Sequence, residues 1–108
     1  MKDIKYLDRI IKYIDKINRF MLHVDTYETF ILNEEKIDAI ILNLEQVGET
    51  VKKLSDLYKQ KHSDIDWINI AGLRNLISHE YEDVDLLLIY TIAKENINEL
   101  LQKLINQH

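Results

Sequence analysis

Five side chains suited to chemistry on phosphate groups lie within eight consecutive residues. They are Arg74, Asn75, Ser78, His79 and Tyr81. Arginine is a permanent cation that binds phosphate oxygens through two parallel hydrogen bonds, and histidine gains or loses a proton near neutral pH. The amide and the two hydroxyls add further hydrogen-bonding groups. This segment is therefore the candidate site of the chain.

If the segment is helical, its polar side chains share one side. At about 100° per residue, the five positions fall on one continuous arc. Four apolar residues fall on the opposite side and are predicted to face a helical core: Ile70, Leu73, Leu76 and Ile77. Glu80 breaks this division, which predicts that the helix ends there.

Two spacings within the arc have consequences. Asn75 and His79 are four residues apart, so the amide is expected to reach the imidazole and fix its orientation. Arg74 and His79 lie about 140° apart, which is wide for one helix. Two copies of the chain meeting across a twofold axis would bring two such pairs around one groove.

Other interpretations of these polar residues remain open. Polar side chains on the outer face of a helix are commonly just solvated, and a histidine in a last helical turn interacts favourably with the helix dipole. A metal site is a weaker alternative. His62, Asp64 and Asp66 precede the same segment, but they include only one histidine, whereas the helical metal motif has two histidines four residues apart.

Composition narrows the functional class. The chain has 108 residues, no cysteine and a formal net charge of -5. The acidic balance argues against a protein that coats DNA or RNA by electrostatic attraction. We expect no DNA partner, no membrane span, no signal peptide and no disulfide, and hence a cytoplasmic protein.

The pattern of apolar residues predicts an all-α fold. Proline is absent and the only glycines are Gly48 and Gly72, so the turns of a sheet protein are not available. Apolar residues recur at helical spacing in segments 4–21, 37–54, 67–81 and 86–104, and short connections favour antiparallel neighbours. We predict an up-and-down four-helix bundle in a single domain, residues 1–108, with an extra turn possible in the linker 25–32.

Helix starts and one glycine complete this prediction. Asn33, Asp66 and Asp85 each precede a predicted helix and can accept hydrogen bonds from its first amides. Gly48 lies in mid-helix, where it costs about 1 kcal/mol relative to alanine. Close approach of a second helix explains it; a tolerated, mildly destabilising residue is the alternative.

The motif and its surroundings resemble a known family. Arg74, four residues, His79, one residue and Tyr81 form a signature similar to that of the HepT-like toxins, a branch of the HEPN (higher eukaryote and prokaryote nucleotide-binding) superfamily. The run 64–75, the Gly48-Glu49 pair and the apolar closing helix are similar as well. The resemblance covers essentially the whole chain.

The resemblance implies a homodimeric, metal-independent endoribonuclease that needs no cofactor and acts on an RNA substrate at a dimer cleft. Arg74 would hold the scissile phosphate and His79 would act as general acid or base. Asn75 and Ser78 would support the cleft. The partner implied is a minimal nucleotidyltransferase, the antitoxin of a type VII toxin–antitoxin system, which transfers AMP to Tyr81 and so silences the toxin.

Two rival functions stay open. One is a non-catalytic subunit that binds nucleotide or substrate for the nucleotidyltransferase. The other is a purely structural dimerisation bundle. Loss of RNA cleavage on replacing Arg74 or His79 would separate the enzyme from both.

Overall fold

The computed structural model of the chain describes residues 2–78 and 85–106, and its regular elements within these ranges are all helical. In chain order they are α1 (Lys2–Met21), α2 (Tyr27–Phe30), α3 (Glu34–Val51), α4 (Asp56–Lys61), α5 (Trp67–Ala71), α6 (Leu73–Ser78), α7 (Leu86–Thr91), the π-helical segment η2 (Ile92–Asn96) and α8 (Ile97–Asn106).

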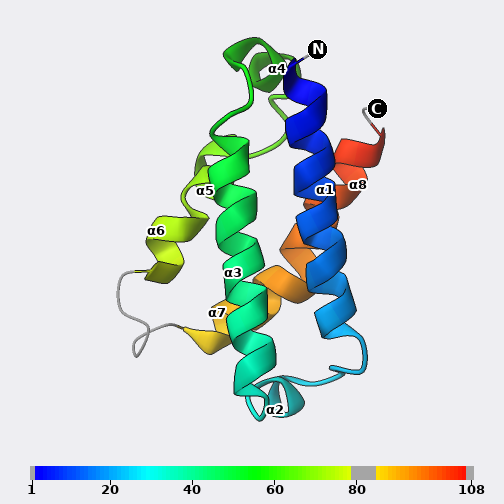
Figure 1. Cartoon of the computed structure of the whole chain (residues 1–108), viewed down its shortest axis with the longest axis vertical. Helices are drawn as coiled ribbons and strands as arrows, with labels where there is room; N and C mark the ends of the chain where they lie inside the picture. Colours follow the sequence, from blue (N-terminus) through cyan, green and yellow to red (C-terminus); the bar gives the residue numbers. More distant parts are fainter. Residues whose placement is uncertain (1, 79–84, 107–108) are drawn as a thin grey trace.

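The long elements form an up-and-down bundle (Figure 1). The chain descends through α1, returns through α3, descends again through α5 and α6, and ascends through α7, η2 and α8. Helix α1 packs along α3, α5 and α6 pack against α3, and η2 and α8 pack against α1. The predicted all-α four-helix architecture is confirmed.

The core stripe of α1 shows why the bundle forms. Leu7, Ile10, Ile14 and Ile17 recur every three or four residues and are at most 1% exposed. Burial of four such side chains removes their apolar surface from water, which stabilises the folded state by about 25 cal/mol for each Å² buried. The stripe joins side chains of α3, α6, η2 and α8 in one continuous core.

The predicted helix starts are confirmed at all three caps. The side-chain oxygen of Asn33 accepts a hydrogen bond from the Lys36 amide at 3.0 Å. Asp66 and Asp85 accept in the same way from amides three residues further on, at 3.2 and 3.1 Å. Each cap satisfies an amide that has no partner inside its own helix.

The start of α1 is fastened to a distant part of the chain. The buried carboxylate of Asp3 accepts hydrogen bonds from the Ser55 amide at 2.8 Å and from the Ser55 hydroxyl at 2.7 Å. These bonds lower the pKa of Asp3. Because Ser55 also caps α4, this contact joins the start of α1 to the start of α4.

The predicted helix boundaries differ from the structure in the second half of the chain. Within the described residues, the helix expected over 67–81 is two helices, α5 and α6, separated at Gly72, where low helix propensity favours an interruption. The predicted helix end at Glu80 lies outside the described residues. Helix α4 was not predicted, because it buries none of its residues and so has no apolar stripe. The linker 25–32 does hold an extra turn, α2.

Candidate functional site

Arg74 lies in the first turn of α6, where its side chain is 59% exposed. Its Nη1 atom donates a hydrogen bond to the Oε1 atom of Glu49 on α3 at 3.1 Å. The pair joins two helices through residues 25 positions apart in the chain. The guanidinium is thus oriented by a neighbouring carboxylate while most of its surface remains accessible to a ligand.

Glu49 also contacts a second cation. Lys52 lies one turn further along the chain, and its Nζ atom is 3.4 Å from the same Oε1 atom. The hydrogen bond from Arg74 is the main cause that lowers the pKa of Glu49, and Lys52 contributes in the same direction. Two cations around one carboxylate leave a net positive charge that can attract a phosphate.

Close packing between α3 and the α5–α6 segment sets this pair in place. A Cβ atom on Gly48 would lie 2.9 Å from the carbonyl oxygen of Ile70 and 3.3 Å from the Cβ atom of Leu73. The prediction that Gly48 permits close helix packing is therefore confirmed. Because Glu49 follows Gly48 and Arg74 follows Leu73, this contact brings the carboxylate and the guanidinium together.

The core face of α6 agrees only in part with the predicted one. Leu73 and Ile77 are 7% and 2% exposed, as expected, but Leu76 is 53% exposed. The prediction that Leu76 is a core residue is wrong. Leu76 was placed in the core because it falls opposite the polar arc, but α6 packs mainly on α3 and its other flank borders a groove.

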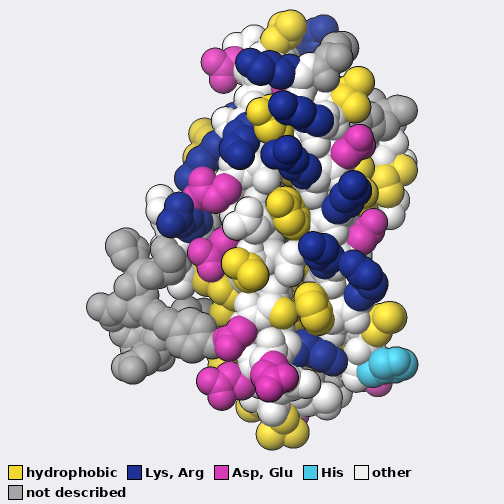
Figure 2. All heavy atoms as spheres, in the orientation of Figure 1, with side chains coloured by type: hydrophobic (Ala, Val, Ile, Leu, Met, Phe, Trp, Pro, Cys, Tyr) yellow, Lys and Arg dark blue, Asp and Glu magenta, His cyan; other side chains and the backbone are white. Residues whose placement is uncertain are grey.

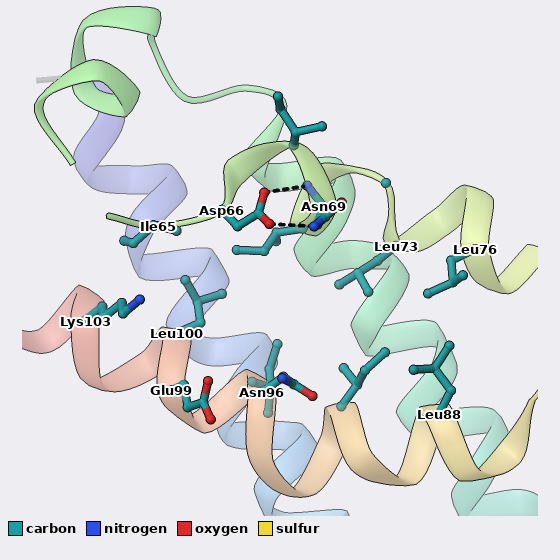
Figure 3. Close-up of a pocket in the computed structure, with 15 residues that line it drawn as sticks. Ile65, Asp66, Asn69, Leu73, Leu76, Leu88, Asn96, Glu99, Leu100 and Lys103 are labelled. Carbon is teal, nitrogen blue, oxygen red and sulfur yellow. Dashed lines mark hydrogen bonds between the residues drawn. The ribbon is translucent and has the colours of Figure 1, made fainter. Parts of the chain in front are cut away.

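This groove is an apolar hollow of about 670 Å³ between α5–α6 and α7–η2–α8 (Figure 3). Leu73 and Leu76 line it from α6, and Leu88 faces them from α7. Asp66, Asn96 and Glu99 contribute polar groups near its other end. Arg74 is not among the residues that line it, so the groove and the Arg74–Glu49 pair occupy different flanks of α6.

The remaining predicted site residues are only partly placed. Asn75 is exposed next to Arg74, and Ser78 is the last residue of α6. His79 and Tyr81 lie outside the described residues, and so do the expected Asn75–His79 contact and the expected Arg74–His79 pairing.

Sequence reasoning missed Glu49 as the partner of Arg74. The pair Gly48-Glu49 was part of the family resemblance, yet a contact over 25 positions leaves no local spacing that could assign its role. Among the described residues, no three His, Asp or Glu side chains converge on a common metal position. None of the described helices has both the length and the apolar character needed to cross a membrane.

Comparison with known proteins identifies the family. Residues 10–106 match the family described as "Ribonuclease HepT-like". The chain belongs to this family of the HEPN superfamily. The match includes α3 and α6, the two helices that carry Glu49 and Arg74.

Several relatives support the assignment. One from Caldanaerobacter subterraneus subsp. tengcongensis, named "Putative RNase", is 41% identical over 63 residues, covering 52% of this chain and 56% of the relative. Two from Methanocaldococcus jannaschii carry the same name. They are 28% and 38% identical over 53 residues, covering 49% of this chain and 49% and 46% of the relatives.

This chain thus spans about half the length of the curated relatives that it matches. No solved structure matches it.

Proposed function

We propose that this HepT-like chain is a metal-independent endoribonuclease, the toxin of a type VII toxin–antitoxin system. The observation that carries the proposal is the Arg74 guanidinium, exposed to solvent yet oriented by Glu49 on another helix. Binding sites for phosphate need a cation that is both accessible and held in place. The family assignment and the names of the relatives supply RNA as the substrate class.

The proposed reaction uses the 2'-hydroxyl of the substrate. His79 accepts the proton of this hydroxyl as its oxygen attacks the adjacent phosphorus, and the bond from phosphorus to the 5'-oxygen breaks. The leaving oxygen takes up a proton from the second histidine of the dimer. The products are a 2',3'-cyclic phosphate and a 5'-hydroxyl.

Arg74 stabilises the charge that develops on the phosphate oxygens in this reaction. Glu49 is a positioning residue, because its carboxylate contacts the guanidinium rather than the RNA. Asn75 and Ser78 support the cleft in which two copies of the chain bring their Arg74 and His79 side chains together. A homodimer is part of the proposal, and its mass in solution tests it.

Regulation follows from the position of Tyr81 in the motif. We propose that a minimal nucleotidyltransferase antitoxin transfers AMP to its hydroxyl. The added phosphate occupies Arg74 and repels the backbone of an incoming RNA, which silences the toxin.

RNA cleavage by the purified protein in EDTA tests the catalytic proposal. We expect the wild-type chain to cleave, and Arg74→Ala and His79→Ala to lose at least about 100-fold in rate, the scale of losing one group that stabilises transition-state charge. Lys36→Ala removes a cation from the start of α3 and should cleave like the wild type. Undiminished cleavage by the Arg74 and His79 variants would refute the proposal, and binding without cleavage by the wild type would favour a non-catalytic subunit.

The regulatory proposal has a separate readout. Incubation with the nucleotidyltransferase and ATP should add the mass of one AMP to the wild type and none to Tyr81→Phe. An unmodified wild-type chain that is nevertheless inhibited would indicate simple sequestration instead.

A further inference from the structure

Helix α1 carries a regular row of cations opposite its core stripe. They recur every three or four residues: Lys2, Lys5, Arg9, Lys12, Lys16 and Arg19. All six side chains are exposed. At about 100° per residue, the six fall within an arc of about 100° whose centre lies about 150° from that of the buried stripe. We call these six residues the α1 basic face.

The net charge of the whole chain hides this segregation. Helix α1 holds six of the 14 cationic residues but only three of the 19 acidic ones. Of these three, Asp3 is buried against Ser55, and Asp8 and Asp15 fall at one edge of the basic arc. Figure 2 shows Lys and Arg gathered in a band over α1 and the upper end of α3. Most of the acidic residues that make the net charge negative, and that argued against RNA binding, therefore lie outside the α1 basic face.

Aromatic rings hold several of these cations in place. The Nζ atom of Lys5 lies 5.1 Å, and the guanidinium of Arg9 5.7 Å, from the centre of the Tyr6 ring. Lys53, just beyond α3, lies 5.9 Å from the same ring. Such contacts restrict otherwise mobile side chains, so less conformational entropy is lost when an anion binds.

The basic face is also connected to the candidate site. From the Tyr6 ring the cations continue to Lys53 and to its neighbour Lys52, which shares the carboxylate of Glu49 with Arg74. An extended polyanion can therefore follow positive charge from α1 across the end of α3 to α6. This continuous path of positive charge links the α1 basic face to the candidate site, which would not be needed if the two surfaces were unrelated.

We propose that the α1 basic face binds the phosphate backbone of RNA, independently of base sequence, and delivers the strand to Arg74. The row from Lys2 to Arg19 rises about 25 Å, with a cation at about every 5 Å, which suits a linear polyanion. RNA as the ligand rests on the proposed ribonuclease function. The face itself lies outside the Arg, His and Tyr motif.

A membrane surface is the other common polyanion, and the structure disfavours it. Helices that bind lipid headgroups insert an exposed apolar face into the membrane. The apolar face of α1 is instead packed inside the bundle, where Leu7, Ile10, Ile14 and Ile17 are at most 1% exposed. This buried stripe is not available to insert into a membrane, which favours a soluble polyanion.

Binding of a fluorescent 30-nucleotide RNA with 2'-O-methyl groups tests the proposal, because such an RNA cannot be cut through its 2'-oxygen. The test variant is Arg9→Gln/Lys12→Gln/Lys16→Gln. The control, Lys36→Gln/Lys94→Gln/Lys103→Gln, makes the same change in net charge away from α1. Circular dichroism should show that both remain helical.

We expect the test variant to raise the Kd at least tenfold at low salt, and the control to stay within twofold of the wild type. The slope of log Kd against log salt should fall by about 2 in the test variant, since each phosphate contact on a single strand contributes about 0.7. Equal effects of the two triple variants would overturn the proposal. So would tight binding to phosphatidylserine vesicles that the test variant loses, because the face would then serve a membrane.

The outcome is separable from that of the catalytic proposal. A wild-type chain that binds RNA through α1 but cleaves none would retain the basic face and refute the ribonuclease. Cleavage that depends on Arg74, together with undiminished RNA binding by the test variant, would support the ribonuclease and refute the role of the α1 basic face.

Discussion

Helix α1 and helix α6 both present cations to solvent, but they are positioned in different ways. Helix α1 has 20 residues, and its own core stripe sets the direction of every cation on its outer face. Helix α6 has six residues and presents Arg74, whose position depends on Gly48 and Glu49 of α3.

The difference separates two kinds of functional surface. A long helix with a continuous buried stripe presents a repeated charge, which is sufficient for binding a repeating polyanion. A single cation that must meet one phosphate needs fixed geometry, and here contacts between helices provide it. Substitutions that weaken the packing of α6 on α3 should therefore affect the candidate site while leaving α1 intact.

The largest effect is expected from Ile77→Ala. Ile77 is 2% exposed, and removing most of a buried isoleucine side chain should lower the free energy of unfolding by about 2–5 kcal/mol. Leu76→Ala is the matched control on the same helix. Because Leu76 is 53% exposed, its truncation should cost less than about 1 kcal/mol.

Chemical denaturation of both variants measures these two changes. Equal losses would mean that α6 does not present the face described here.

A smaller effect is expected from Gly48→Ala. The new Cβ atom would lie 2.9 Å from the backbone oxygen of Ile70, and such overpacking costs about 1–3 kcal/mol. Better helix propensity returns about 1 kcal/mol, so the net loss should be up to about 2 kcal/mol. Thermal or chemical unfolding measures it.

Gly72→Ala is the control for Gly48→Ala. Its Cβ atom would come no closer than 3.4 Å to a neighbouring atom, and the φ angle of -81° suits alanine. We expect a change within about 0.5 kcal/mol, typical of sites without such a clash. If Gly48→Ala stabilised the protein, the tight contact between α3 and the α5–α6 segment would be refuted.

The smallest effect concerns the acid–base behaviour of Glu49. In the folded protein Arg74 lowers the pKa of Glu49, so the stabilising ion pair is complete at neutral pH and is lost as the pH falls through that lowered pKa. NMR titration of the carboxyl carbon should show a higher pKa in Arg74→Ala than in the wild type. Lys52→Ala should raise it less, because Lys52 is the weaker influence. An unchanged pKa in Arg74→Ala would mean that the two side chains do not pair in solution.

Features fixed within one helix were predictable from the sequence. The apolar spacing of α1 and α3 and the caps Asn33, Asp66 and Asp85 gave the helix order and the bundle, because these depend on residues within one or two turns. Gly48 was also interpreted correctly, since a mid-helix glycine has a stability cost that close packing explains.

Features fixed between helices were not predictable in the same way. Leu76 was misassigned because its burial depends on which flank of α6 another helix covers. Glu49 was missed because it meets Arg74 across 25 positions. The spacing of the cations in α1 contained the signal for the α1 basic face. It was missed because the net charge of the whole chain is negative and does not show how the charges are distributed.

One kinetic measurement tests the central claim most directly. Initial rates of RNA cleavage, measured over a range of RNA concentrations, compare the wild type with Arg74→Ala and with Arg9→Gln/Lys12→Gln/Lys16→Gln. The account predicts that Arg74→Ala lowers kcat by about 100-fold or more, while the α1 variant mainly raises KM. A wild-type kcat in Arg74→Ala would contradict the assignment of Arg74 to the cleavage site.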